Sequence, residues 1–437
     1  MTAHQATSQP DTALVEALAE VRRRTLLLTA PLPDHELERQ IDPIMSPLVW
    51  DLAHIAAYED LWLAHRHAGL PLLRPDLAAI YDAFETPRSE RGDAELLDAP
   101  GARAYLEAVR ERVLAAIETH GVDPVIHPMV LRHEQQHTET MLQALTLARL
   151  PGYDVRVTGE PAPAPASAAS NGASANGGAP VVHTGLELVS VPGGMVELGA
   201  DDTAFSYDNE RPRHPGWVAP FRIGRTLVTN ATWLAFCEGG GYERREWWTD
   251  EAWSWKEEYD ISHPLHWARG EDGSWVEHTM RGAAPLDPAR PAAHVSWFEA
   301  AAFARAHGVR LPTEHEWETA ATWDQPVASG HAELAPGRFA TAPVGAFPGG
   351  AARCGALDLL GNLWEWTSSV FGGYPGFRAH PYREYSEVFF DRGYRVLRGG
   401  SWATQHEVAT PTFRNWDLPQ RRQIFCGVRL AADEESP

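Results

Sequence analysis

The stretch His127–Gly152, HPMVLRHEQQHTETMLQALTLARLPG, decides the fold of the N-terminal part of this chain. Its apolar residues recur at helical spacing, so they lie along one side of a single long helix. We expect the helix to end at the Pro151-Gly152 pair. Because such a helix has to bury its apolar side against neighbouring helices, the stretch predicts a helical bundle.

Three earlier segments have the same amphipathic pattern and complete the predicted bundle. Residues 13–28 carry apolar side chains at helical spacing, and residues 101–121 form a helix that should end at Gly121. Residues 46–66 begin with Ser46 as the predicted N-cap and Pro47 at the first helical position. The spaced apolar residues of the first segment are Leu14, Leu18, Val21 and Leu28. Four such helices predict an antiparallel four-helix bundle over residues 12–155.

The rest of the chain has a different character. Residues 156–185 are rich in Ala, Pro, Ser and Gly, a composition typical of a flexible linker. Residues 186–434 combine short apolar segments such as FRIGRTLVT and YRVLRGGSW with helical stretches such as SWFEAAAFARAHG and with many glycine pairs. The predicted fold class is therefore α+β in two domains, a helical bundle followed by a loop-rich α+β domain.

Charge and composition exclude several classes of partner. The formal net charge of −22 argues against nucleic acid and against an anionic membrane surface. We find neither an N-terminal apolar segment typical of a signal peptide nor an apolar run of membrane-spanning length. The three cysteines are far apart in the sequence and form no C-x-x-C motif, which favours a reduced, cytoplasmic protein.

Three histidines in the helical part predict a metal site. His133 and His137 are one helical turn apart, so both rings project from the same side of their helix. His54 lies in the middle of an earlier helix and is the best candidate for a third ligand from a facing helix. Three imidazoles with open coordination positions suit either Zn²⁺ or non-haem Fe(II), and ligand type alone does not choose between them.

The sequence RHEQQHTE, residues 132–139, also contains the H-E-x-x-H pattern of zinc proteases. A zinc hydrolase of this type would need a further ligand in a characteristic position, and TETMLQALTLARL after His137 contains no Gly-x-x-His. Glu134 is one residue round the helix from His133, and we expect it to face solvent. The hydrolase is therefore a remote alternative.

Two groups of motifs together resemble a known family. DPIMSPLVWDLAHIAAYEDLWL (42–63) and HEQQHTETMLQAL (133–145) resemble the DinB-like helical domain of the ergothioneine-biosynthesis sulfoxide synthases (EgtB). RLPTEHEWETAA, GNLWEWTSS, YRVLRGGSWA and FRNWDLPQRRQIFCGVRLA resemble their C-terminal domain, which is similar to formylglycine-generating enzyme and has a C-type-lectin-like fold. The resemblance covers nearly the whole chain apart from both ends and the linker.

This resemblance implies an oxidoreductase that depends on O₂ and on mononuclear non-haem Fe(II). Such enzymes join the sulfur of γ-glutamylcysteine to the imidazole carbon of hercynine (Nα-trimethylhistidine) and leave a sulfoxide. His54, His133 and His137 match the iron ligands. Tyr382 matches a tyrosine expected to deliver a proton from the second domain, which would complete the active site, although Tyr385 is close in sequence.

The resemblance also implies a set of substrate-binding residues. Arg88 and Arg91 match an arginine pair that would hold the carboxylates of the thiol, and Gln136 matches a glutamine that would bind hercynine. Asn415, Trp416 and Asp417 match a short segment that would line the pocket. Arg421 would add a third arginine contact. An indole face suits a trimethylammonium group, and a guanidinium binds a carboxylate with two parallel hydrogen bonds.

Other functions remain open at this point. The same fold and iron chemistry could use free cysteine or a selenosugar as the nucleophile. A non-catalytic lectin-like binding protein would leave the three histidines unexplained. Formylglycine-generating activity is disfavoured, because no cysteine pair stands where its copper site would require one. The sequence leaves the oligomeric state open.

Overall fold

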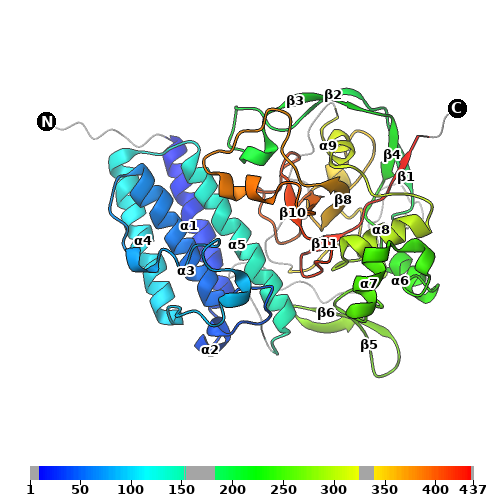
Figure 1. The fold of residues 1–437 in the computed structure, drawn as a ribbon, viewed down its shortest axis with the longest axis horizontal. Coiled ribbons are helices and arrows are strands. Elements are labelled where there is room, and N and C mark those ends of the chain that lie inside the picture. Colours follow the sequence, from blue (N-terminus) through cyan, green and yellow to red (C-terminus); the bar gives the residue numbers. More distant parts are fainter. Residues whose placement is uncertain (1–8, 152, 154–182, 324–338, 435–437) are drawn as a thin grey trace. The chain divides into compact units, whose positions relative to one another are not determined.

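The computed structural model describes residues 9–151, 153, 183–323 and 339–434 (Figure 1). The chain divides into two compact units, Met1–Val157 and Thr158–Pro437. The predicted linker, residues 156–185, falls almost entirely outside the described residues, so its boundaries stay a prediction. The predicted class, α+β in two domains, is confirmed by the helices of the first unit and the sheets of the second.

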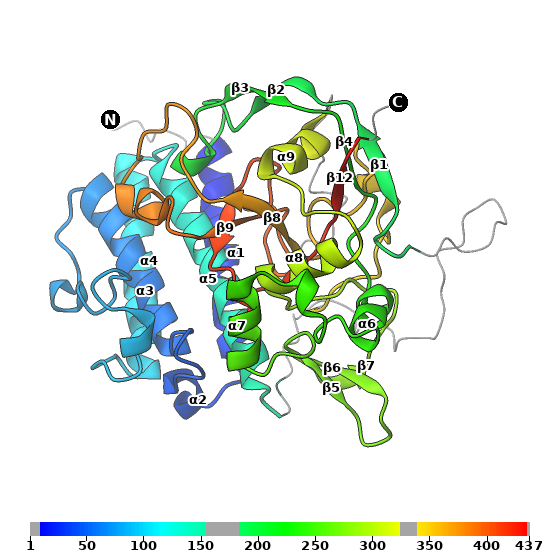
Figure 2. The same ribbon diagram turned by 45° about the vertical axis from the view of Figure 1, so that its right-hand side comes forward.

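The first unit is the predicted helical bundle. The segments predicted to be helical form four long helices, while a short fifth helix, α2, joins the first two of them. Their bounds are α1 Gln9–Thr29, α2 Asp34–Glu38, α3 Leu48–Glu59, α4 Ala99–His120 and α5 Ile126–Ala148. α3 packs against both α4 and α5, and α5 also packs against α1 (Figures 1 and 2). Since α3 and α5 are neighbours, side chains from both can meet inside the bundle.

The start of α3 differs from the prediction. Pro47, not Ser46, is the N-cap residue, and it makes no side-chain capping hydrogen bond. The Ser46 hydroxyl instead accepts a hydrogen bond of 2.7 Å from Nη1 of Arg91. A partner 45 residues away therefore takes the oxygen that would have capped the helix. At its other end α3 continues directly into a π-helical segment, Asp60–His67.

Two of the helix ends match their local signals to different degrees. α4 ends at His120 and is followed by Gly121 with φ +72°, the positive value that glycine tolerates best. α5 ends at Ala148, before the predicted stop at Pro151, because Arg149 already adopts a left-handed conformation with φ +48°. The prediction for α5 was wrong by about one turn, and that for α4 is confirmed.

The second unit is built from small sheets and short helices. The sheets have strand orders β1-β4-β12, β10-β9-β8-β11, β2-β3 and β5-β6-β7, and the described pairs are antiparallel except β11 with β8. The strands are β1 Leu188–Val191, β2 Gly194–Leu198, β3 His214–Val218, β4 Phe221–Gly224, β5 Trp267–Arg269, β6 Trp275–Thr279, β7 Gly282–Pro285, β8 Trp364–Val370, β9 Arg395–Arg398, β10 Asn415–Asp417, β11 Cys426–Gly427 and β12 Ala431–Asp433. The helices are α6 Asn230–Glu238, α7 Asp250–Glu258, α8 Trp297–Ala306 and α9 Glu314–Thr322. α9 packs against β8 and β9 (Figure 2).

Buried ion pairs connect the motifs of this unit. Glu365, from GNLWEWT, accepts hydrogen bonds of 2.6 and 2.8 Å from Arg429, from CGVRL. Glu318, from EHEWE, binds Arg398, from RVLRGG, at 2.7 Å. Both carboxylates lie in the protein interior, where an unpaired charge would be costly. Each buried ion pair therefore holds together two motifs that are far apart in the sequence.

The two glycines of the RGGSW motif serve the fold. Gly399 and Gly400 have φ of +95° and +81°, and a Cβ atom on Gly399 would lie 2.5 Å from the carbonyl oxygen of Leu359. A side chain at this position would force the backbone apart.

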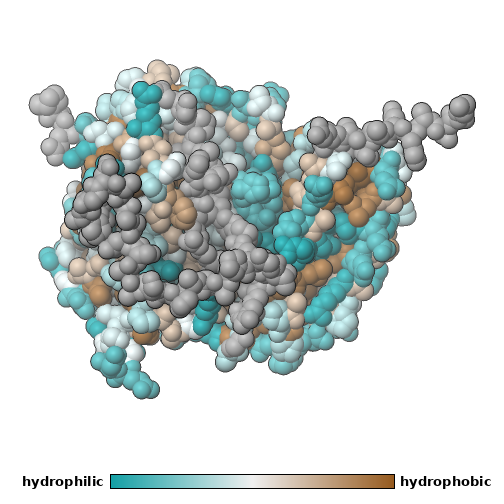
Figure 3. Space-filling view, turned by 180° about the vertical axis from the view of Figure 1, so that it is seen from behind, coloured by the Kyte–Doolittle hydropathy of each residue, from teal (hydrophilic) through white to brown (hydrophobic). Residues whose placement is uncertain are grey.

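Among the described residues no helix is long and apolar enough to cross a membrane. On the face drawn in Figure 3, teal polar residues are interspersed with smaller brown apolar areas.

Candidate metal centre

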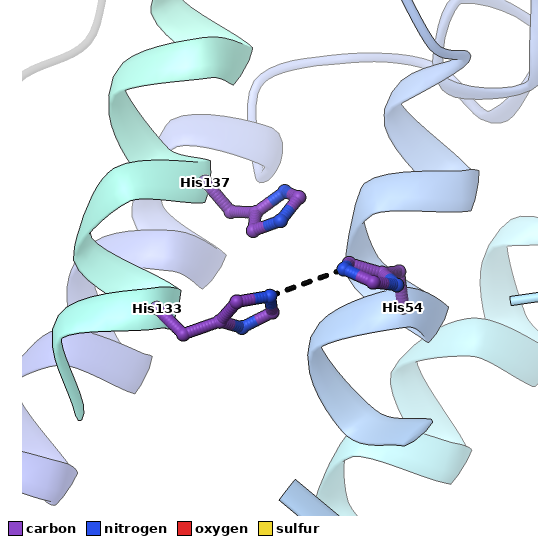
Figure 4. Close-up of side chains that lie close together, drawn as sticks. All are labelled: His54, His133 and His137. Atoms are coloured by element: carbon purple, nitrogen blue, oxygen red, sulfur yellow. Dashed lines mark hydrogen bonds between the residues drawn. The ribbon is translucent and has the colours of Figure 1, made fainter. Parts of the chain in front are cut away.

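Three histidines converge inside the first unit. His54 projects from α3, and His133 and His137 project from successive turns of α5, so that the three rings face one another (Figure 4). Nε2 of His54 lies 3.1 Å from Nε2 of His133. The three residues offer ligand atoms that all lie within 4.8 Å of one another, close enough to bind one ion. The structure thus brings together the three histidines that the sequence singled out.

Each histidine ring is held by a different neighbour. Nδ1 of His54 donates a hydrogen bond of 2.6 Å to the carbonyl oxygen of Tyr81. Nδ1 of His137 lies 3.0 Å from Oδ1 of Asp51. The His133 ring stacks on the phenol of Tyr58, with ring centroids 3.7 Å apart. The hydrogen bonds and the stacked ring fix the orientation of all three imidazoles.

These contacts fit the requirements of a metal ion. A carbonyl oxygen can only accept, so Nδ1 of His54 carries the proton and its Nε2 presents a lone pair toward His133. Burial, with His137 nearby, holds the pKa of His54 well below its usual range, and the pKa of His133 is lowered for the same reasons. Neutral imidazoles whose second nitrogen is hydrogen-bonded are the usual form of histidine ligands.

Glu134, in contrast, takes no part in this centre. Its carboxylate accepts hydrogen bonds from Arg22 Nε at 2.9 Å, from Thr25 Oγ1 at 2.8 Å and from Arg110 Nη2 at 3.1 Å. The prediction that Glu134 faces solvent is wrong, because its side chain is 2% exposed. Although burial opposes ionisation, Arg22 and Arg110 keep the pKa of Glu134 below its ordinary value. A zinc hydrolase would need this carboxylate as a free general base, so the geometry argues against that alternative.

The predicted substrate-binding arginines of the first unit differ in their surroundings. Arg88 begins a short exposed 3-10 helix, Arg88–Glu90. Arg91 is buried, with its guanidinium 3.4 Å from the centroid of the Trp50 ring. Its nitrogens donate to carbonyl oxygens of Thr86 and Ala83 at 2.9 and 3.4 Å, besides the Ser46 hydroxyl already described. Arg91 therefore braces the loop that lies against Trp50.

Gln136, the predicted hercynine contact, lies on α5 beside His137. Its Nε2 donates a hydrogen bond of 3.3 Å to the carbonyl oxygen of Arg132 one turn earlier. The side chain is partly exposed.

The predicted pocket segment of the second unit forms the edge strand β10. Trp416 stacks on Phe371, with ring centroids 4.2 Å apart and the rings almost parallel. Because successive side chains alternate along a strand, Asn415 and Asp417 project from the face opposite Trp416. Asp417 pairs with Arg421, whose Nε lies 3.7 Å from Oδ1. The segment therefore presents an aromatic face and a polar face.

Tyr382 and Tyr385 occupy different surroundings. Tyr385 stacks on Tyr207 with ring centroids 4.2 Å apart, and its ring also meets the edge of Trp416 at 5.8 Å. Tyr382 precedes the 3-10 helix Arg383–Tyr385 and meets Tyr385 edge-on at 6.3 Å. Tyr385 is thus the more closely packed of the two, stacked on Tyr207 and in contact with the edge of Trp416.

Sequence reasoning missed the partners that hold the histidines. Asp51 is three residues before His54 on the same helix, yet it contacts His137, which is 86 residues away. The contact of Tyr81 uses a backbone carbonyl, for which no residue type gives a signal. The available signal in the sequence was an acidic residue one turn before His54 on an apolar helix. The sequence could not show that its partner is His137, because that contact depends on the packing of α3 against α5.

Comparison with known proteins agrees with this architecture. The DinB superfamily model matches residues 17–141, and the model of the sulfatase-modifying factor enzyme 1-like domain matches residues 177–434. A formylglycine-generating enzyme of Streptomyces coelicolor is 31% identical, over 63% of this chain and 96% of that protein.

Full-length relatives include both units. A hercynine oxygenase of Mycolicibacterium thermoresistibile is 43% identical, over 96% of this chain and 94% of that protein. A hercynine oxygenase of Mycobacterium tuberculosis is 44% identical, over 95% of this chain and 97% of that protein. With both domain models matched and this identity along nearly the whole length, the chain belongs to the hercynine oxygenase family.

Proposed function

We propose that this chain is an O₂-dependent, mononuclear non-haem iron(II) sulfoxide synthase that joins the sulfur of γ-glutamylcysteine to the imidazole carbon of hercynine. The observation that carries the proposal is the cluster of three histidines in a chain of the hercynine oxygenase family. The names of the relatives support hercynine as the first substrate. The thiol follows from the resemblance and is tested separately below.

The proposed reaction balances with one O₂. A C–H bond of hercynine and the S–H bond of the thiol are replaced by a C–S bond, which releases two electrons and two protons. Oxidation of the sulfur to the sulfoxide provides two more electrons and takes up one oxygen atom, while the other oxygen atom leaves as water. Iron(II) held by His54, His133 and His137 would supply the O₂ reduction and would bring the sulfur and the imidazole carbon together.

We assign the proton donor to Tyr382. Because one oxygen atom of O₂ leaves as water, protons have to be delivered to it, and a phenol is a neutral donor that keeps its proton at physiological pH. The aromatic packing of Tyr385 on Tyr207 supports the choice of Tyr382.

We assign hercynine binding to Gln136 and to the β10 segment. The amide of Gln136 can donate to or accept from a polar group of hercynine, since it offers both functions. The indole of Trp416 suits the trimethylammonium group by a cation–π contact. Asn415 and Asp417, on the other face of the strand, suit a polar partner, and the carboxylate of Asp417 suits the amine of γ-glutamylcysteine.

We assign the carboxylates of the thiol to Arg88 and Arg91, with Arg421 as a third contact. A γ-glutamyl thiol carries two carboxylates, and a guanidinium matches each with two parallel N–H donors. Arg88 is exposed. Three of the five N–H groups of Arg91 are engaged, two by carbonyl oxygens of the loop it braces and one by the Ser46 hydroxyl. Arg91 would therefore contact substrate and loop together.

We also propose a cytoplasmic location. The three cysteines Cys237, Cys354 and Cys426 are free thiols, which is usual for proteins kept in a reducing compartment.

The proposal is tested with protein purified without O₂ and loaded with Fe(II). Metal analysis should find close to one iron per chain. Hercynine is then supplied with γ-glutamylcysteine, free cysteine or a selenosugar in separate reactions, while O₂ uptake is recorded and products are identified by mass spectrometry. We expect the γ-glutamylcysteine sulfoxide, with one O₂ consumed per product.

His137→Ala is the matched control, because it removes one imidazole from the centre and should lose both iron and O₂ uptake. Stoichiometric zinc without O₂ uptake would refute the iron assignment. A product formed with cysteine or the selenosugar, and none with γ-glutamylcysteine, would keep the iron chemistry and replace the thiol.

A further inference from the structure

Asp51 makes a direct contact with the histidine cluster that none of the roles above uses. It lies in the first turn of α3, its side chain is 2% exposed, and its Oδ1 is 3.0 Å from Nδ1 of His137 on α5. Its second oxygen, Oδ2, is buried and has no hydrogen-bond partner among the residues that the structure describes. A carboxylate that is buried with one oxygen unsatisfied costs stability, so its presence needs an explanation.

The contact determines which nitrogen of His137 carries the proton. An ionised carboxylate only accepts hydrogen bonds, so Nδ1 of His137 donates to Asp51, and in the neutral ring that binds a metal ion the lone pair is on Nε2. His54 reaches the same state through the carbonyl oxygen of Tyr81. The two supports differ in charge, because a carbonyl is neutral and Asp51 carries a negative charge.

That charge matters because the cluster itself has none. The group that can hold an ion consists of His54, His133 and His137, and neutral imidazoles leave a divalent ion uncompensated. Asp51 places one negative charge a single hydrogen bond away from a ligand ring. A carboxylate in this position strengthens the ligand nitrogen as an electron donor.

Two other roles for Asp51, an interaction with the helix dipole and an ion pair with Arg91, do not explain its burial against His137. An acid in the first helical turn interacts favourably with the helix dipole, but this effect needs no burial, and the helix has no side-chain cap. Arg91 is close enough for its charge to interact with that of Asp51. Its three described hydrogen bonds nevertheless go to Thr86, Ser46 and Ala83. The described direct partner of Asp51 is therefore His137.

We propose that Asp51 is a positioning residue of the metal centre, which holds His137 with Nε2 free for the ion and supplies a negative charge to it. The inference rests on the proposed metal site and is independent of the identity of the substrates. It predicts that removal of the charge alone, with the shape and the hydrogen-bond acceptor kept, weakens metal binding.

The test measures metal affinity rather than turnover. Wild type, Asp51→Asn and Asp51→Glu are titrated without O₂ and at one pH with Fe²⁺, and separately with Co²⁺, in competition with a chelator. Asp51→Asn should bind both ions about 10- to 100-fold more weakly and should alter the visible spectrum of bound Co²⁺. Asp51→Glu keeps the charge and should retain more of the affinity than Asp51→Asn.

The matched control is Asp60→Asn. Asp60 is equally buried and belongs to the helical run that continues α3, but its carboxylate binds Leu73 N and Arg112. This variant should bind metal like the wild type even if it unfolds at a lower temperature. Circular dichroism of each apoprotein at the titration temperature confirms that the molecules compared are folded.

The possible outcomes separate the two proposals. Wild-type affinity in Asp51→Asn, or an equal loss in Asp60→Asn, overturns the role of Asp51. If Asp51→Asn does not fold, Asp51→Ala takes its place, and wild-type affinity together with an unchanged Co²⁺ spectrum in that variant refutes the positioning role. A wild-type chain that binds neither ion refutes the metal centre itself, and with it the proposed function.

Discussion

Glu134 directly follows a histidine of the candidate metal centre, yet its carboxylate is bound by Arg22, with Nε of the guanidinium 2.9 Å from Oε1. Arg22 also binds Glu59 through Nη2 at 2.6 Å. Arg110 completes the group by contacting both carboxylates, at 3.1 Å to Glu134 and 2.6 Å to Glu59. Two acids and two bases from α1, α3, α4 and α5 therefore neutralise one another inside the bundle. In this helix, H-E-x-x-H combines two candidate ligands with one structural acid.

Glu134→Gln should destabilise the bundle and leave the metal centre intact. The variant leaves two buried guanidinium groups with one carboxylate, and breaking a buried pair costs about 3–5 kcal/mol. Thermal unfolding should therefore shift to lower temperature, while the iron content of the folded protein stays near that of the wild type. Glu20→Gln, which breaks an exposed pair with Arg23, should change stability by at most about 1 kcal/mol. Unchanged stability with loss of metal would contradict this assignment.

Tyr382→Phe should abolish or divert sulfoxide formation while iron binding is unchanged, because it removes one phenolic proton and leaves the ring in place. Tyr385→Phe is the matched control and should remain active, since the stacking of this ring on Tyr207 needs no hydroxyl. Products are compared by mass spectrometry and iron by metal analysis. Full activity of Tyr382→Phe with loss in Tyr385→Phe would transfer the proton role to Tyr385.

Local signals in the sequence predicted the elements well, and distant partners explain the errors. Gly121 marks the end of α4 because the positive φ is a property of that one residue. Ser46 failed as a cap because Arg91, far along the chain, takes its hydroxyl. Glu134 failed as a surface residue for the same kind of reason, since its partners come from other helices.

The candidate metal site was predictable because its signal is a repeat of one residue type at helical spacing. The spacing of His133 and His137 places both rings on the same side of one helix. His54 is the histidine in the middle of another apolar helix that could supply the third ligand. The support of the site was not predictable, because the contact between Asp51 and His137 exists only once α3 and α5 are packed together.

Replacing Arg88 or Arg91 by alanine should affect the KM for the thiol in both cases, but the unfolding temperature only in the case of Arg91. Arg88→Ala removes an exposed guanidinium and should raise the KM for the thiol with little change in the unfolding temperature. Arg91→Ala should raise the KM and also lower the unfolding temperature, since it removes hydrogen bonds to the loop and to Ser46 and the contact with Trp50. Steady-state kinetics with varied thiol and thermal unfolding measure both effects.

Arg91→Lys sharpens this comparison, because lysine keeps the positive charge and loses the planar fork of donors. It should remain less stable than the wild type. An unfolding temperature equal to that of the wild type in both Arg91 variants would show that the loop does not depend on this residue.

Asp208 should make the stability of the second unit depend on pH. It accepts hydrogen bonds from Ser386 Oγ at 2.6 Å and from the backbone N–H of His380 at 3.3 Å, so it holds the segment that contains Tyr382. Burial raises the pKa of Asp208 to about 6, although these hydrogen bonds oppose the shift. The folded protein therefore binds this proton more tightly than the unfolded chain does.

The raised pKa fixes the sign of the effect. The contribution of Asp208 to stability is fully present below pH about 4, falls as pH rises to about 6, and stays lost above it. Asp208→Asn cannot ionise, so it should gain stability relative to the wild type across this window, by up to about 3 kcal/mol. Thermal unfolding between pH 4 and 7 measures the difference, with the exposed Asp202→Asn expected to follow the wild-type curve. A constant difference between Asp208→Asn and wild type across this range would show that Asp208 is ionised throughout, held so by Ser386 and the backbone of His380.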